Sequence, residues 1–97
     1  MDPNSIPIEQ WMLDELRLRG ARLIVFALVY SAHGPIRLSR GEMAHQCGLH
    51  ESTVRRACAA LERDGLIRLA SPEDARRGMA KTWIATASPS RASNPNY

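Results

Sequence analysis

Residues 39–67, SRGEMAHQCGLHESTVRRACAALERDGLI, constrain the fold more than any other part of this 97-residue chain. Ser39 and Glu42 form a Ser-x-x-Glu capping box, in which each side chain accepts a hydrogen bond from the other residue's backbone N–H. The box predicts a short helix over about residues 40–47. Gly48 then supplies the positive φ that a sharp helix exit requires, so we expect this helix to end in a tight turn.

A second helix is expected directly after the turn, from about residue 51 to residue 64. Its apolar residues recur with the i, i+3, i+4, i+7 spacing of one buried helix face. These residues are Val54, Ala57, Cys58 and Leu61. Gly65 is well placed to end this helix at its C′ position, and the apolar pair Leu66-Ile67 then enters a strand.

The spacing around the turn is typical of a helix-turn-helix. Ala44 is small enough for a second helix to cross closely, and Val54 can pack back between the two helices. The stretch resembles the winged helix-turn-helix superfamily. The residues that carry the resemblance are Met43, Ala44, Cys47, Gly48, Leu49, Val54, Ala57, Leu61 and the ending Leu-Glu-x-x-Gly-Leu-Ile. It implies a mainly α fold with a small β-hairpin: a three-helix core plus a wing, with an extra N-terminal helix.

In the superfamily the second helix of the motif lies in the DNA major groove, with its N-terminal half facing the base edges. Arginines there bind guanine or phosphates, and hydroxyl side chains take either role. The resemblance therefore implies DNA contacts from Ser39, Arg40, Ser52, Thr53, Arg55 and Arg56. The alternative is that these are ordinary solvated positions, and Glu51 places a negative charge close to them.

A basic wing is expected over about residues 70–81, between two strands that form a hairpin. Its tip carries Arg76 and Arg77, with Lys81 nearby. In the family a wing tip touches a phosphate or enters the minor groove. Asp74 and Arg76 resemble the wing of MarR-type regulators, where the aspartate orients the arginine. The alternative interpretation is a solvated loop.

The N-terminal part supplies the expected support for the motif. Residues 8–18 predict a first helix, in which Trp11 is assigned to core packing, with a homodimer contact through this helix as the alternative. The apolar run within residues 21–33 predicts a buried scaffold helix, because it is too long for a strand and ends at Gly34. Residues 35–38 are short and alternating, which predicts a small strand. The resemblance to winged helices implies that this strand pairs with the wing.

A looser resemblance covers about residues 6–69. The stretch IPIEQWM, followed by the run LIVFALVY, is similar to the start of helix-turn-helix domains in phage and plasmid replication-initiation proteins. That resemblance implies binding at a replication origin rather than at a promoter. The C-terminal domain that recruits replication partners in that family has no counterpart in these 97 residues.

Length and charge agree with one small domain. We expect a flexible N-terminus over residues 1–7, the winged domain over residues 8–87, and a disordered tail or linker over residues 88–97. Residues 35–87 carry nine Lys and Arg against six acidic residues, whereas residues 1–34 carry three against four. The positive excess therefore coincides with the motif and wing, as a phosphate-facing surface requires.

Several classes of function are disfavoured. No residue constellation has the spacing of a nucleophile and base, and no phosphate-binding glycine loop is present, so we expect no enzyme and no cofactor. Cys47 and Cys58 predict small core residues of a reduced, cytoplasmic protein; with His45 and His50 they match no familiar zinc spacing, so no metal is expected. No apolar run is long enough to span a membrane.

The function expected from the sequence is sequence-specific binding of double-stranded DNA by a transcriptional regulator. Two alternatives remain open. One is an origin-binding module of a replication initiator. The other is a winged helix that binds a protein partner and has no affinity for DNA.

Overall fold

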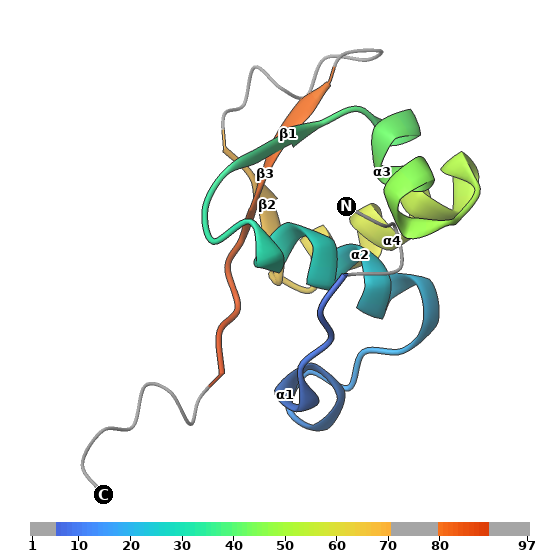
Figure 1. Cartoon of the computed structure of the whole chain (residues 1–97). Coiled ribbons are helices and arrows are strands. Elements are labelled where there is room, and N and C mark those ends of the chain that lie inside the picture. The colour runs from blue at the N-terminus through green and yellow to red at the C-terminus, as the bar shows by residue number, and fades with distance from the viewer. Residues whose placement is uncertain (1–5, 71–79, 90–97) are drawn as a thin grey trace, which may run out of the picture.

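The computed structural model describes residues 6–70 and 80–89 of the chain. The elements are α1 (Gln10–Asp14), α2 (Gly20–Ser31), β1 (Ile36–Leu38), α3 (Arg40–Cys47), α4 (Glu51–Arg63), β2 (Ile67–Leu69) and β3 (Lys81–Ala85) (Figure 1). The mainly α fold is confirmed, and α2, α3 and α4 form the three-helix core. A flexible N-terminus was expected over residues 1–7 and a tail over residues 88–97. Residues 1–5 and 90–97 of these segments lie outside the described residues.

The three short strands form one antiparallel sheet in the order β1-β3-β2 (Figure 1). Trp83 of β3 lies opposite Ile36 of β1 on one side and opposite Leu69 of β2 on the other. The expected pairing of β1 with the second wing strand is therefore confirmed. Trp83 is buried, so the sheet is fixed to the helical core through its central strand.

Helix α2 is the scaffold of the core. All five residues from Val25 to Val29 are buried, so the helix is enclosed on every side along its middle turn. It packs most extensively against α4 and also contacts α1, α3 and β3. Fully burying one such large apolar side chain contributes about 1.5–3 kcal/mol. None of the helices in the described ranges has the length and apolar character needed to cross a bilayer.

The prediction for the first helix was wrong in extent. A helix over residues 8–18 was expected, but α1 spans only Gln10–Asp14. Arg17 has a φ of 58°, which a continuing helix excludes. The reversal brings buried Leu18 back onto the core, where its N–H donates to the carbonyl of Met12 at 3.1 Å. Burial of Leu18 accounts for this early end, because a longer helix would carry that side chain away from α2.

Trp11 is a core residue, as predicted. Its ring packs edge-on against Phe26 at a centroid distance of 5.8 Å and against Tyr30 at 5.1 Å. Its indole N–H donates to the Glu9 carboxylate at 2.8 Å, so the polar edge of the ring is satisfied. Ile8 falls within the expected helix of residues 8–18, but 45% of its surface is exposed. It lies before the helix begins, which explains the difference.

The scaffold helix also ends earlier than expected. The prediction placed His33 in its last turn, whereas α2 ends at Ser31. His33 has a φ of 55°, and this left-handed residue turns the chain toward β1. A second small difference concerns Cys47, which is half-buried rather than a full core residue because it lies at the end of α3.

Two glycines of the motif give a matched test of the turn. Gly48 has a φ of 68° and open space where a Cβ would lie, so Gly48→Ala strains only the backbone. We expect a loss of about 1–2 kcal/mol in the free energy of unfolding. Gly41 lies in the first turn of α3, where a Cβ would meet the end of the Glu51 side chain at 3.4 Å and the Ser39 hydroxyl oxygen at 3.9 Å. Gly41→Ala should gain up to about 1 kcal/mol from helix propensity.

Urea denaturation of both variants and the parent chain measures the two effects. The turn assignment is wrong if Gly48→Ala is as stable as the parent chain. Gly41→Ala is the control that shows whether an added methyl group alone changes stability in this part of the fold.

Candidate nucleic-acid interface

The start of α3 is fixed by the predicted capping box. The backbone N–H of Ser39 donates to Glu42 Oε1 at 2.7 Å, and the Glu42 N–H donates to Ser39 Oγ at 3.1 Å. The bonds from the Ser39 backbone and hydroxyl favour the ionised carboxylate, so the pKa of Glu42 is lowered.

Helix α4 begins with a histidine cap. His50 Nδ1 accepts a hydrogen bond from the Ser52 backbone N–H at 3.2 Å, in place of the usual serine or threonine oxygen. The Ser52 hydroxyl lies 3.0 Å from the same nitrogen. Ser52, predicted to contact DNA, is therefore also part of the helix start.

The two faces of α4 are sharply divided. The predicted apolar stripe is buried, and Val54 and Leu61 have no exposed surface. Arg55 and Arg56 are exposed, while Thr53 is half-buried. Consecutive residues of a helix are separated by about 100° of rotation, so Arg55 and Arg56 lie toward different sides of the exposed face.

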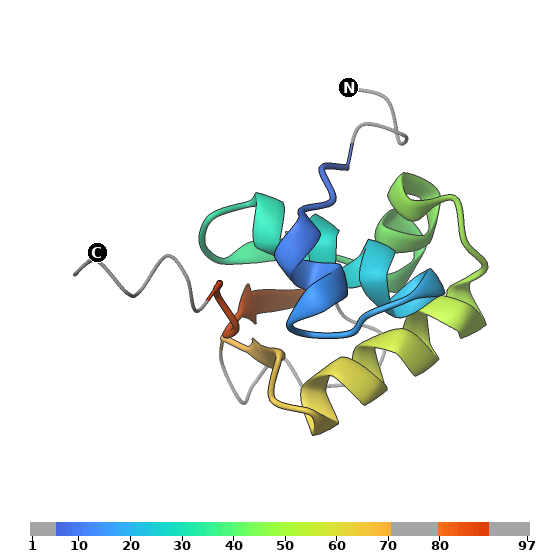
Figure 2. The same ribbon diagram turned by 90° about the horizontal axis from the view of Figure 1, so that it is seen from below.

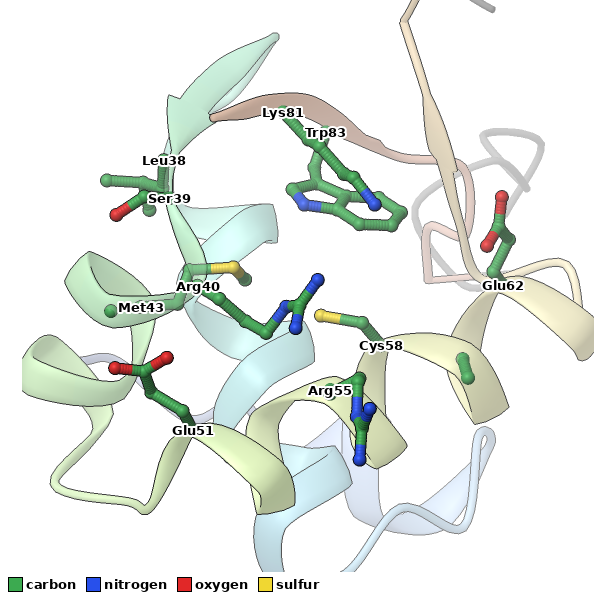
Figure 3. Close-up of a pocket in the computed structure, with 12 residues that line it drawn as sticks. Leu38, Ser39, Arg40, Met43, Glu51, Arg55, Cys58, Glu62, Lys81 and Trp83 are labelled. Atoms are coloured by element: carbon green, nitrogen blue, oxygen red, sulfur yellow. The ribbon is translucent and has the colours of Figure 1, made fainter. Parts of the chain in front are cut away.

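A groove of about 450 Å³ lies on the Arg55 side of α4, bounded by the start of α3 and by β1 and β3. The side chains of Arg40 and Lys81 extend into it from α3 and β3 (Figure 3). Two carboxylates of α4, Glu51 and Glu62, also line it, so its charge is mixed. Its remaining lining is largely apolar and includes Leu38, Met43, Cys58 and Trp83. We call it the α3–α4 groove.

The charged residues of the α3–α4 groove affect the pKa of the Cys58 thiol. Burial raises the pKa of Cys58 to about 11, and the neighbouring Cys47 acts in the same direction. The positive charges of Lys81 and Arg40 act against that rise, which agrees with their convergence on one groove. Burial likewise raises the pKa of Cys47 to about 11.

A second groove, of about 370 Å³, lies on the other side of α4, against the start of α2. Its charged lining residues are Arg19, Arg22 and Arg56, and no acidic residue lines it. We call it the α2–α4 groove. Arg19 and Arg22 were not among the predicted contacts, because they lie outside the helix-turn-helix stretch and the expected wing. Only the packing of α2 on α4 brings them beside Arg56, and no sequence spacing indicates that proximity.

The predicted contact residues thus divide between the two grooves. Those that line the α3–α4 groove are Ser39, Arg40, Arg55 and Lys81. Those that line the α2–α4 groove are Thr53 and Arg56. The expected wing-tip residues Asp74, Arg76 and Arg77 lie outside the described residues. Within residues 6–70 and 80–89, no three His, Cys, Asp or Glu side chains gather as metal ligands would.

Comparison with known proteins supports this architecture. The family model of the IclR helix-turn-helix domain matches residues 28–70, from the second half of α2 to the end of β2. Among solved structures, a MarR-family transcriptional regulator from Silicibacter pomeroyi aligns with a TM-score of 0.54 and 23% identity over 84% of this chain. The chain has the winged helix-turn-helix fold. No curated protein matched its sequence.

The winged helix-turn-helix assignment identifies the corresponding elements. Helices α3 and α4 are the two helices of the motif, and β2 and β3 are the paired antiparallel strands that follow it in the chain. The chain spans about half the length of the MarR-family structure, since the alignment covers 50% of that protein.

The reactivity of the two thiols tests the burial of Cys47 and Cys58. At pH 8 a thiol with a pKa of about 11 holds over 100-fold less thiolate than a free cysteine. We therefore expect iodoacetamide to alkylate native Cys47 and Cys58 at least about 100-fold more slowly than the same residues in guanidinium. Mass spectrometry of timed samples measures both rates. Equal rates in the native and unfolded chain would contradict the assigned burial.

Proposed function

We propose that this chain binds double-stranded DNA through α4 and acts as a transcriptional regulator. The observation that carries the proposal is the placement of cationic side chains on both sides of the exposed face of α4. Arg40, Arg55 and Lys81 lie on one side, and the α2–α4 groove lies on the other. A helix inserted in the major groove has a phosphate backbone on each side, and this surface matches that distribution of charge.

The dimensions of α4 suit this role. Its 13 residues make it about 20 Å long, and an α-helix fits the B-DNA major groove, which is about 12 Å wide. Arg55 lies in its N-terminal half, the part that meets base edges in this fold. A bidentate bond from Arg55 to guanine O6 and N7 would supply direct readout. Ser39 and Arg40, at the start of α3, line the α3–α4 groove and are placed for phosphate contacts.

One observation favours the protein-interaction alternative. Glu51 and Glu62 line the same groove as Arg55, and two carboxylates near a phosphate backbone weaken affinity. The DNA-binding interpretation is preferred because the groove still holds three cations against these two carboxylates. Glu51 also lies in the first turn of α4, where a negative charge stabilises the helix independently of any partner.

Two finer expectations remain predictions. Binding at a replication origin rather than at a promoter would be decided by selecting genomic fragments on the immobilised protein and mapping them.

A homodimer contact through α1 would have to use other residues than Trp11 and Met12, which are buried within the chain. Ile8 is the one large apolar side chain found exposed in the described ranges, and it lies beside this helix.

Fluorescence anisotropy with a labelled random-sequence duplex tests the proposal. Non-specific binding with a Kd on the order of 10⁻⁴–10⁻⁶ M near physiological salt is expected, weakening steeply as salt rises. Charge reversal at Arg40 and Arg55 should weaken binding by about tenfold or more, because it removes two phosphate or base contacts and adds repulsion.

Arg63→Glu is the control for that double variant. It changes charge on the same helix, but Arg63 lies eight residues beyond Arg55, about 12 Å along the axis and away from the N-terminal half. Absence of binding at low salt would refute the DNA-binding function. A protein partner would then be sought by pull-down with the parent chain and the same variants. A partner that binds another face of the domain should still bind the charge-reversed variant.

A further inference from the structure

We propose that Arg19 and Arg22, at the start of α2, together with Arg56 of α4, bind the phosphate backbone of one DNA strand beside the recognition helix. The inference rests on the proposed DNA-binding function and extends it. It adds two residues from outside the helix-turn-helix motif to the DNA contact. It also assigns one side of that contact to the α2–α4 groove.

The position of the groove is the first argument. The start of α2 lies beside the N-terminal half of α4 (Figure 2), and the groove between them has a volume of about 370 Å³. The side chains that line it include Arg19 and Arg22 from one helix start and Thr53 and Arg56 from α4. Residues more than thirty positions apart in the chain therefore converge at the end of α4 that meets DNA in this fold.

The charge of the groove is the second argument. All three arginines are exposed, and among the described residues none of them forms an ion pair with a carboxylate. Arg56 donates through Nε to the backbone carbonyl of Ser52 at 3.4 Å. That bond orients the side chain and leaves both terminal Nη groups for a ligand. Three uncompensated guanidinium groups around one hollow favour a polyanion.

The shape of the groove is the third argument. Between the arginines its walls are formed by small residues, Ala21, Ala57 and Ala60, with Thr53. No large side chain in this lining would hold a sugar-phosphate backbone away from the helix surface. The planar guanidinium fork matches phosphate oxygens in a bidentate manner, and the threonine hydroxyl adds a neutral donor. The ligand chemistry that fits is a phosphodiester.

The two grooves differ in a way that gives them separate roles. The α3–α4 groove contains Glu51 and Glu62 beside its cations, whereas acidic residues are missing from the lining of the α2–α4 groove. In a major groove the two strands flank the inserted helix, so each groove of the protein meets a different strand. The α2–α4 groove is the more purely electrostatic of the two contacts. Removing an arginine from the α2–α4 groove should therefore lower the salt dependence of DNA binding more than removing a cation from the α3–α4 groove.

The test uses the full chain and a fluorescein-labelled duplex of arbitrary sequence, with the association constant measured at several salt concentrations. Each phosphate contact contributes about 0.9 to the slope of log K against log salt. Arg19→Gln combined with Arg22→Gln should reduce the slope by about 1.8, which corresponds to about 60-fold weaker binding near 0.1 M salt. Arg22→Gln alone should reduce it by about 0.9.

Arg63→Gln is the matched control for Arg22→Gln. It also removes one exposed arginine charge, at the C-terminal end of α4, where Arg63 pairs with Asp64 at 3.6 Å. Its slope should equal that of the parent chain. Thermal unfolding of all variants should remain unchanged, because the altered side chains are exposed.

The outcomes separate this inference from the function on which it rests. If the parent chain binds and the double variant keeps its slope, the α2–α4 contact is refuted while DNA binding stands. If Arg22→Gln and Arg63→Gln lose affinity and slope equally, the effect is one of net charge and the contact is again refuted. If the parent chain does not bind the duplex at low salt, both the function and the contact fail.

Discussion

The packing of α2 against α4 is the interaction on which the rest of this structure depends. Helix α2 packs against α4 more extensively than against any other element. Val54 and Leu61 then fill the interface from α4 with no exposed surface. This contact fixes which face of α4 is buried, and it leaves the opposite face with its arginines in solvent. A cavity-forming change at Val54 would therefore disturb the functional surface as well as the core.

The sheet and α3 build the other half of the surface. Trp83 fixes the central strand to the core, and the strand then directs Lys81 toward the groove that Arg40 enters from α3. Both cations lie near the Cys58 thiol, whose raised pKa they partly oppose. The protein thereby keeps its positive charges on short, well-supported elements beside α4.

Local sequence signals predicted most of the motif because each of them acts within a few residues. The capping box at Ser39 needs only Glu42, and the exit from α3 needs only Gly48 at positive φ. The early end of the first helix was not predictable in this way. It depends on the burial of Leu18 in the core, and nothing in residues 8–18 encodes where that burial site lies.

The sequence by itself thus determined the helix-turn-helix, its capping box and turn, and the apolar face of α4. These features follow from backbone geometry and from the periodicity of apolar residues, which are local properties. Only the tertiary structure decided which charges face one another. It separated Arg55 from Arg56 and placed Arg19 and Arg22 beside Arg56. Charge proximity depends on how distant helices cross, and the crossing is set by the packing of the whole core.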